Sequence, residues 1–331
     1  MNTRAFSSYL KAQKFIMSID QGTTSTRALL IPANSSKDSV QGLHVVASHQ
    51  EELTQYTEKP GWVSHNPVEI YKTVLKCIEG VMQKNGITKD QIECVGITNQ
   101  RETTVAWDKV TGKPIQNAVV WLDKRTESTV EDLLLQADND QFKYSKTTGL
   151  PISTYFSGVK MKWFMSDKND NQKDILKAIS DDRLYFGTVD SWLIYCLTGK
   201  HKFVTDATNA SRTMLMNIST LEWDSDMLDT FNIPRSSLPK IIKESSSDFG
   251  IIAEEVLRGV PITGVMGDQQ SACLGHVLRE GEVKCTYGTG CFILCNSGEN
   301  LVYSKNGLLS TVLWKLSKEQ NVTYGLEGAV E

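Results

Sequence analysis

The residues best suited to chemistry form a short polar turn between two apolar runs, within residues 15–30. The turn and its end contain an acid, a glycine, three hydroxyl residues and an arginine: Asp20, Gly22, Thr23, Thr24, Ser25 and Arg27. A carboxylate can hold a hydrated metal ion, and the N–H groups and hydroxyls of a tight turn can hold phosphate oxygens. An ordinary β-hairpin fits the same residues, because Gly and Thr are common in turns.

A second segment of the same kind favours the phosphate interpretation. Residues 283–295 again place a Gly-Thr turn, Gly288 and Thr289, between two runs of strand-forming residues. Two such hairpins predict two related lobes, each of which contributes one hairpin to a nucleotide held between them.

Arg101 and Glu102 form a second candidate, because a five-donor fork beside an acceptor-only carboxylate matches hydroxyls that both donate and accept. Taken alone, however, an Arg-Glu neighbour pair is usually only a surface feature. Asp268 directly follows an apolar run and precedes a helical pattern. It can therefore be a helix-capping acid or a base that accepts a proton from an alcohol.

Strand and helix patterns alternate around these residues, which predicts an α/β protein. Asn66 and Pro67 open a helical pattern, and residues 92–98 form a short buried strand. The polar residues 99–102 follow that strand at its carboxyl edge, where open α/β sheets bind ligands. Further strands are predicted at 44–48, 118–122, 262–266, 307–316 and 323–330, and Thr188 is predicted to cap a helix that ends at Gly199.

Composition limits the partners of the chain. It has 331 residues, 40% of them hydrophobic, which is enough for two domains with real cores. The 35 basic and 39 acidic residues give a net charge of -4 and no long-range field suited to nucleic acid. No apolar run approaches the roughly 20 residues of a membrane helix. We expect a globular cytoplasmic protein with no nucleic-acid partner and no transmembrane segment.

The cysteines and the N-terminus bear on the compartment. The seven cysteines show no CxxC spacing, which favours a reducing compartment and argues against metal ligation by cysteine. Residues 1–14 are predicted to be a disordered leader. The first 19 residues contain Arg4, Lys11 and Lys14 and no acid, a composition that also allows a mitochondrial association.

Four motifs occur in a fixed order: Asp20–Arg27, Gly96–Thr104, Gly267–Gln270 and Thr286–Phe292. With them the chain resembles the FGGY carbohydrate kinase family of the actin and Hsp70 ATPase superfamily, and within it the kinases that act on glycerol. The resemblance implies a ribonuclease H-like α/β fold, with a complete first lobe at 15–276. It also implies the beginning of a similar second lobe at 277–331, truncated at its C-terminal side.

The activity implied by the resemblance is transfer of the ATP γ-phosphate to glycerol, giving sn-glycerol 3-phosphate and ADP, with Asp268 as general base. The residues that would take the glycerol hydroxyls are Arg101, Glu102, Tyr155, Asp268 and Gln269. Trp121 and Phe292 would form an apolar wall. Without the resemblance, these aromatic residues fit core packing better.

The resemblance also assigns the phosphate end of the site. Asp20 would hold Mg²⁺ through water, and Thr23, Thr24 and Ser25 would hold the ATP phosphates. Arg27 would steady the moving phosphate, and Gly288 and Thr289 would bind it from the second lobe. The full-length protein is expected to form a homo-oligomer.

Two alternatives stay open. The chain can be a kinase for another small polyol, since the family shares its phosphate hairpin and catalytic aspartate. It can also be a catalytically inactive truncated homologue that binds glycerol or a protein partner. Because family members continue well past Glu331, we expect an intact glycerol pocket, weak ATP binding and poor solubility in the isolated chain.

Overall fold

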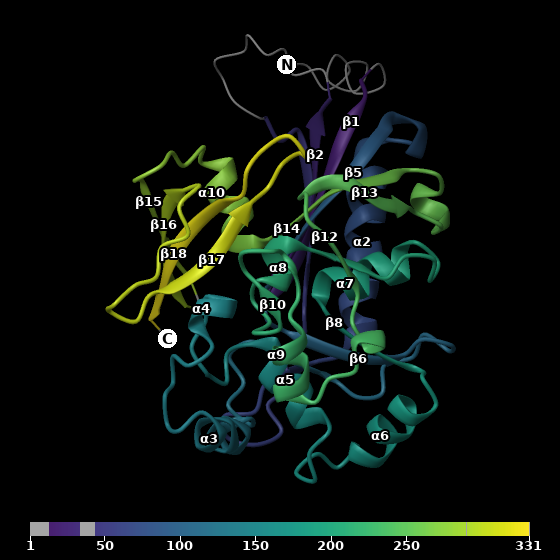
Figure 1. Ribbon diagram of the computed structural model, residues 1–331. Helices are drawn as coiled ribbons and strands as arrows, with labels where there is room; N and C mark the ends of the chain where they lie inside the picture. The colour runs from purple at the N-terminus through teal and green to yellow at the C-terminus, as the bar shows by residue number, and fades with distance from the viewer. Residues whose placement is uncertain (1–12, 34–43, 289, 331) are drawn as a thin grey trace.

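A computed structural model describes residues 13–33, 44–288 and 290–330 as a mixed α/β protein (Figure 1). The predicted leader lies outside the described residues up to residue 12. Within the described ranges, no helix combines the length and the apolar character needed to cross a membrane.

The largest sheet has six strands. Three parallel strands form its centre, one antiparallel strand lies at one edge, and two successive antiparallel strands lie at the other. In spatial order they are β13 (Ser246–Ile251), β14 (Pro261–Gly267), β5 (Ile92–Asn99), β1 (Phe15–Gln21), β2 (Ser25–Pro32) and β3 (Ala47–Glu52). Because β1, β5 and β14 run parallel, their carboxyl ends meet at one edge. The residues that follow β5 and β14 therefore lie side by side at that edge.

The predicted first hairpin is confirmed as β1 and β2. Alternate residues of β1 are buried, and the N–H of Gly22 donates to the carbonyl of Ser25 at 2.9 Å, which closes the turn. The register pairs Asp20 with Arg27 across the two strands. The hairpin thus presents its acid and its arginine next to each other.

The helix predicted after Asn66 is α2 (Pro67–Asn85). Asn66 Oδ1 accepts from the N–H of Val68 at 2.9 Å, and the helix ends at Gly86 in the left-handed conformation with φ 63°. Its apolar face packs on β2 and β3 in the same core as the buried residues of β1 and β5.

Smaller elements complete the first part of the chain. The remaining helices are α3 (Glu127–Gln136), α4 (Ser145–Thr148), α5 (Ser157–Phe164), α6 (Gln172–Ser180), α7 (Val189–Leu197), α8 (Ala207–Ala210), α9 (Ser225–Phe231) and α10 (Asp268–Gly275), with 3-10 turns η1 (Lys89–Gln91), η2 (Arg235–Ser237) and η3 (Glu255–Leu257). A four-stranded sheet has the order β4 (Ser64–His65), β7 (Ala118–Val119), β6 (Thr104–Asp108) and β8 (Leu184–Thr188). Two short pairs are β9 (Val204–Asp206) with β12 (Lys240–Ile242), and β10 (Met216–Asn217) with β11 (Glu222–Trp223).

A second four-stranded sheet contains the predicted second hairpin and lies to the left in Figure 1. Its antiparallel strands are β15 (Val283–Tyr287), β16 (Cys291–Gly298), β18 (Thr323–Val330) and β17 (Leu309–Trp314), in that order. Helices α8 and α10 contact β17, and α10 also contacts β16. On the hairpin, Val283, Cys285, Tyr287 and Ile293 are exposed.

The second sheet shares a hydrophobic core with the first part of the chain. Leu294, Val312 and Leu313 belong to the same buried cluster as Phe156. The N–H of Ser310 donates to the carbonyl of Gly149 at 2.9 Å, and a Cβ at Gly149 would lie 2.2 Å from the carbonyl oxygen of Ser310. The two parts are therefore in close backbone contact at this point.

Three local predictions need correction. The strand predicted at 44–48 begins at Ala47, and the one at 118–122 is the two-residue β7. The helix after Thr188 is confirmed as α7, but Thr188 makes no side-chain cap. Its hydroxyl donates instead to the buried carboxylate of Asp190, which needs a partner more than the helix end does.

Candidate functional site

A cavity of about 150 Å³, here called the substrate cavity, opens at the carboxyl edge of β5 and β14. Its lining is Thr23, Thr24, Arg101, Glu102, Trp121, Tyr155, Asp268, Gln269, Thr286, Gly288, Gly290 and Phe292. This set contains every residue predicted to contact glycerol, together with two turn threonines and Gly288 from the second hairpin. Pockets for drug-sized ligands measure about 300–1,000 Å³, so this cavity suits a smaller molecule.

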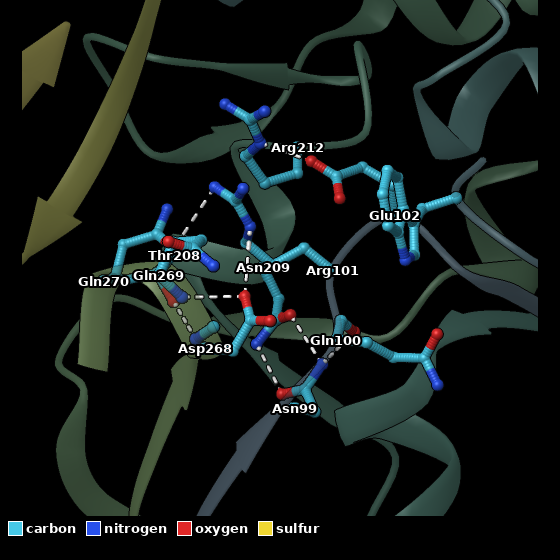
Figure 2. A network of polar contacts seen from close by, with 12 residues as sticks. Asn99, Gln100, Arg101, Glu102, Thr208, Asn209, Arg212, Asp268, Gln269 and Gln270 are labelled. Atoms are coloured by element: carbon cyan, nitrogen blue, oxygen red, sulfur yellow. Dashed lines mark hydrogen bonds and ion pairs between the residues drawn. The ribbon is translucent and has the colours of Figure 1, made fainter. Parts of the chain in front are cut away.

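Arg101 is buried beside the cavity and is held by several acceptors. Its Nη1 and Nη2 donate to the two carboxylate oxygens of Glu327 at 2.6 and 2.8 Å, a bidentate pair. Its Nε lies 3.4 Å from Asp268 Oδ1, and Figure 2 shows the side chain reaching between Asp268 and Gln270. The fork predicted to meet substrate is therefore largely taken up by a carboxylate from the second sheet.

Glu102 adopts an unusual backbone conformation at the cavity. Its φ is 57°, and the N–H of Thr103 donates across it to the carbonyl of Arg101 at 2.7 Å, which makes a tight three-residue turn. Its Oε1 accepts from Nε of the fully buried Arg212 at 2.6 Å. This ion pair leaves the other carboxylate oxygen of Glu102 to act as an acceptor.

Arg212 and Glu327 join these two residues into one buried charge network. Nη2 of Arg212 donates to Glu327 Oε1 at 3.1 Å, so Glu327 accepts from both arginines. Burial alone would raise the pKa of Glu327, but the charges of Arg101 and Arg212 outweigh it and hold that pKa below its usual value. Two arginines and two carboxylates thus balance each other in the protein interior.

Asp268 is the first residue of α10, directly after β14. Its Oδ1 accepts from the N–H of Gln269 at 2.7 Å, and about a third of its side chain, 34%, is exposed. Desolvation by the surrounding protein raises its pKa to about 6, although Arg101 opposes this shift. The carboxylate is therefore a stronger base than an ordinary aspartate and is still ionised at pH 7.

A backbone contact fixes the position of Asp268. The N–H of Gly267 donates to Thr208 Oγ1 at 2.9 Å, and that hydroxyl donates to the buried carboxylate of Asp206 at 2.9 Å. Figure 2 also shows Asn99 and Asn209 facing each other, and their amides exchange hydrogen bonds of 2.9 and 3.2 Å. The strand ends at the cavity are thus joined by a satisfied polar network.

Three aromatic residues form one side of the cavity. The ring of Trp121 lies edge-on to Tyr155 at 5.8 Å and to Phe292 at 5.6 Å between centroids. The indole Nε1 donates to Thr23 Oγ1 at 2.9 Å. Trp121 therefore contacts both the apolar wall and the first hairpin turn.

The structure does not bring all the predicted phosphate residues to the cavity. Thr23, Thr24 and Gly288 line it, whereas Asp20, Ser25 and Arg27 do not. The exposed Arg27 donates instead to Gln50 Oε1 from Nη2 at 2.7 Å, because the neighbouring strand offers it this acceptor. Thr289 lies outside the described residues.

Asp20 is suited to a hydrated cation. Burial raises its pKa and Arg27 partly offsets that rise, so a nearby positive charge would stabilise the carboxylate. In the described ranges, no group of three or more His, Cys, Asp or Glu side chains could hold a metal. A single carboxylate fits Mg²⁺, which is commonly held by one or two carboxylates, water and substrate phosphates.

Arg212 and Glu327 were missed as site residues in the sequence. Glu327 is the one charged residue in the strand-like run 322–330, and a charge in a buried strand requires a partner. That pattern could have pointed to Glu327. Arg212 lies inside the polar segment 208–213, where nothing in the local sequence distinguishes a buried arginine from an exposed one.

Comparisons with known proteins agree with this geometry. The N-terminal domain of the FGGY family of carbohydrate kinases matches residues 15–275. The chain is 46% identical over 321 residues to a glycerol kinase of Natranaerobius thermophilus, and the match covers 96% of this chain and 61% of that protein. The chain thus spans about three-fifths of the length of the curated relatives it matches.

Solved structures extend the comparison to the fold. The crystal structure of Plasmodium falciparum glycerol kinase with ADP superimposes with a TM-score of 0.85 at 40% identity, covering 96% of this chain and 61% of that one. A gluconate kinase from Lactobacillus acidophilus, 21% identical, matches with a TM-score of 0.80 over 96% of this chain and 60% of its own, which shows the fold alone. These matches confirm the predicted α/β fold of the actin and Hsp70 type. The chain belongs to the FGGY family of carbohydrate kinases.

Proposed function

We propose that this chain carries the glycerol-binding and phosphate-binding part of a glycerol kinase, which transfers the γ-phosphate of ATP to glycerol and gives sn-glycerol 3-phosphate and ADP. The observation that carries the proposal is the substrate cavity. It is small, and its lining includes both Asp268 and the threonines of the first hairpin turn, Thr23 and Thr24. A cytoplasmic location remains a prediction from composition, and a homo-oligomer remains one from the family resemblance.

The cavity offers the groups that a short polyol needs. Glu102 and Asp268 supply carboxylate acceptors, Arg101 supplies donors, and Tyr155 supplies a hydroxyl. The aromatic wall limits the room for a longer carbon chain. Because buried ion pairs already hold Arg101 and Glu102, these groups are preorganised before substrate binds.

Asp268 acts as the general base in this proposal. An alcohol oxygen is a poor nucleophile until its proton is accepted, and a carboxylate within hydrogen-bond reach can accept it as the bond to phosphorus forms. The raised pKa of Asp268, about 6, increases its affinity for that proton while leaving it ionised at neutral pH. When the phosphoryl group has been transferred, the proton remains on Asp268 and then passes to solvent.

The first hairpin turn would hold the phosphate groups of ATP. Thr23 and Thr24 line the cavity and can donate their hydroxyls to phosphate oxygens. Asp20 would hold Mg²⁺ through water, and the bound ion would neutralise phosphate charge. Thr289, Ser25 and Arg27 are proposed phosphate contacts on the basis of the family resemblance.

The experiment that tests the proposal measures binding and transfer separately. Calorimetry with glycerol should give saturable heat for the full chain, and for Asp268→Asn with similar affinity. Phosphate transfer from ATP to glycerol should fall by about 10²–10⁴ in Asp268→Asn, the usual contribution of a general base. Asp226→Asn is the matched control, because this exposed acid lies in the first turn of α9 as Asp268 does in α10.

Each outcome assigns a function. A folded chain that takes up no glycerol would refute the proposal. A chain that binds glycerol but transfers no phosphate would be the inactive, glycerol-binding homologue. Stronger binding of a five-carbon polyol than of glycerol would indicate a kinase for another polyol.

A further inference from the structure

Lys284 is a buried cation beside the substrate cavity, although it does not line it. It lies on β15, is 7% exposed, and makes no ion pair within 4.0 Å to a carboxylate in the described part of the chain. Its ammonium instead donates to Gln269 Oε1 at 2.8 Å and to the hydroxyl of Thr286. Burial correspondingly lowers its pKa. A charge held in the interior by neutral partners requires an explanation.

The contacts of Lys284 determine which way the Gln269 amide faces. An ammonium has three donors and no acceptor, so Gln269 must turn its carbonyl oxygen toward it. The hydroxyl of Thr286, which accepts from Lys284, donates to the same Oε1 at 3.1 Å. Both lone pairs of the Gln269 carbonyl are then used within the protein. The described residues show no acceptor for the Gln269 NH₂ group.

We infer that Lys284 is a positioning residue: it fixes the side-chain amide of Gln269 so that the NH₂ group, and not the carbonyl, faces the substrate. The inference rests on the proposed function and deepens it. In this arrangement the side chain of Gln269 donates a hydrogen bond to a substrate oxygen and does not accept one.

This polarity matches the chemistry at the neighbouring residue. Asp268 accepts the proton of the reacting hydroxyl, so the same hydroxyl oxygen can accept a hydrogen bond from a donor such as the Gln269 NH₂. The backbone N–H of Gln269 donates to Asp268 at 2.7 Å, which ties the donor to the base. A rotated amide would present a second acceptor and repel the oxygen that the site must hold. Lys284, which lies on the second sheet, prevents that rotation.

The first test does not need substrate. The side-chain amide signals of Gln269, assigned by their loss in Gln269→Ala, are recorded by ¹⁵N NMR in the full chain and in Lys284→Met. Met keeps the length of the side chain and removes its donors, and loss of a buried charge without a carboxylate partner should not unfold the protein. The signals should shift and exchange faster with solvent in Lys284→Met, and unchanged signals would overturn the inference.

The second test uses glycerol affinity. Lys284→Met should weaken glycerol binding about tenfold, near the value of one hydrogen bond, and Lys284→Arg should recover most of that loss. In a Gln269→Ala background, Lys284→Met should have no further effect, because Lys284 acts through Gln269. The control is Lys315→Met, which removes a lysine that pairs with Glu244 and does not line the cavity.

The two proposals fail in different ways. Absence of glycerol binding by the unmodified chain would refute the glycerol kinase assignment, while the NMR comparison still decides the role of Lys284. Normal binding with equal affinities for the unmodified chain and Lys284→Met would refute the positioning role alone.

Discussion

Two ends of the candidate site are built in opposite ways. At the proposed polyol end, Arg101, Glu102, Arg212 and Glu327 are buried and joined by three ion pairs, and Nη1 of Arg212 is left without a hydrogen-bond partner among the described residues. At the proposed phosphate end, the turn at residues 22–25 is partly or fully exposed, and the described residues give no partner for the hydroxyls of Thr24 and Ser25. In the proposed function, the first arrangement fixes donors and acceptors for a neutral polyol before it binds. The second leaves hydroxyl donors available for phosphate oxygens.

The strongest test of this difference is Glu327→Ala. It removes the carboxylate that balances two buried arginines, so we expect the free energy of unfolding to fall by about 3–5 kcal/mol. Urea unfolding followed by circular dichroism measures the change. Glu327→Gln keeps a hydrogen-bonding oxygen and should lose less. A loss below about 1 kcal/mol in the alanine variant would show that the buried charge network contributes little to stability.

Gly267→Ala tests how tightly Arg101 is held. A Cβ at Gly267 would lie 2.9 Å from Cγ and Cδ of Arg101 and from Gln270 Oε1, so overpacking should cost about 1–3 kcal/mol. Gly275→Ala is the control, since a Cβ there meets nothing within 4 Å and Gly275 ends α10. Thermal unfolding of the two variants at equal concentration compares them. Equal midpoints would mean that Arg101 can move aside at little cost.

The pH dependence of stability should have opposite signs for two of the acids. The pKa of Glu327 is lowered, so its contribution is present above the unfolded value of about 4.5 and is lost as the pH falls. The pKa of Asp268 is raised to about 6, so stability is lost as the pH rises from the unfolded value of 3.8 to about 6, and the full cost remains at pH 7. Asp268→Asn should therefore stabilise the protein at pH 7, by less than Glu327→Ala destabilises it, and should leave stability unchanged near pH 3. Unfolding curves at both pH values decide this.

Trp121→Phe removes the hydrogen bond that links the two ends of the site. Loss of the indole donor to Thr23 should cost about 0.5–1.5 kcal/mol of stability. Thr23→Val and the double variant complete a cycle, in which a coupling near zero would show that the wall and the turn are independent.

Arg27→Ala should have the smallest effect on the fold. Its exposed guanidinium pairs with Gln50 on a surface strand, so the free energy of unfolding should change by no more than about 0.5 kcal/mol. The same substitution should raise the pKa of Asp20 further, because Arg27 now lowers it. Carboxyl chemical shifts followed by NMR would report this, and a stability loss as large as that of Gly267→Ala would contradict the contrast between the two ends.

Local signals explain which predictions from the sequence succeeded. The cap at Asn66, the hairpin at residues 15–32 and the strand before Asp268 depend on neighbouring residues, and the structure confirms each. The motif order also indicated the lining of the cavity. The pairing of Arg101 with Glu327 depends on residues 226 positions apart and could not be derived from either neighbourhood.

The contacts of individual side chains also depend on how the chain folds. Thr188 has the composition of a helix cap, yet the buried carboxylate of Asp190 takes its hydroxyl. Arg27 donates to Gln50, a contact that its neighbours in the sequence do not indicate. In both cases a partner in the folded chain determines the contact. Such partners appear once the strands are placed.

The contact between Gly149 and Ser310 has a consequence for building chimeras. The second sheet cannot be replaced on its own by that of another carbohydrate kinase. Its strand β17 lies so close to residue 149 that a side chain there would clash with the carbonyl of Ser310. A graft would have to carry its facing surface, including the core partners of Leu294 and Leu313. The second sheet and the surface that it packs against must therefore be transferred together.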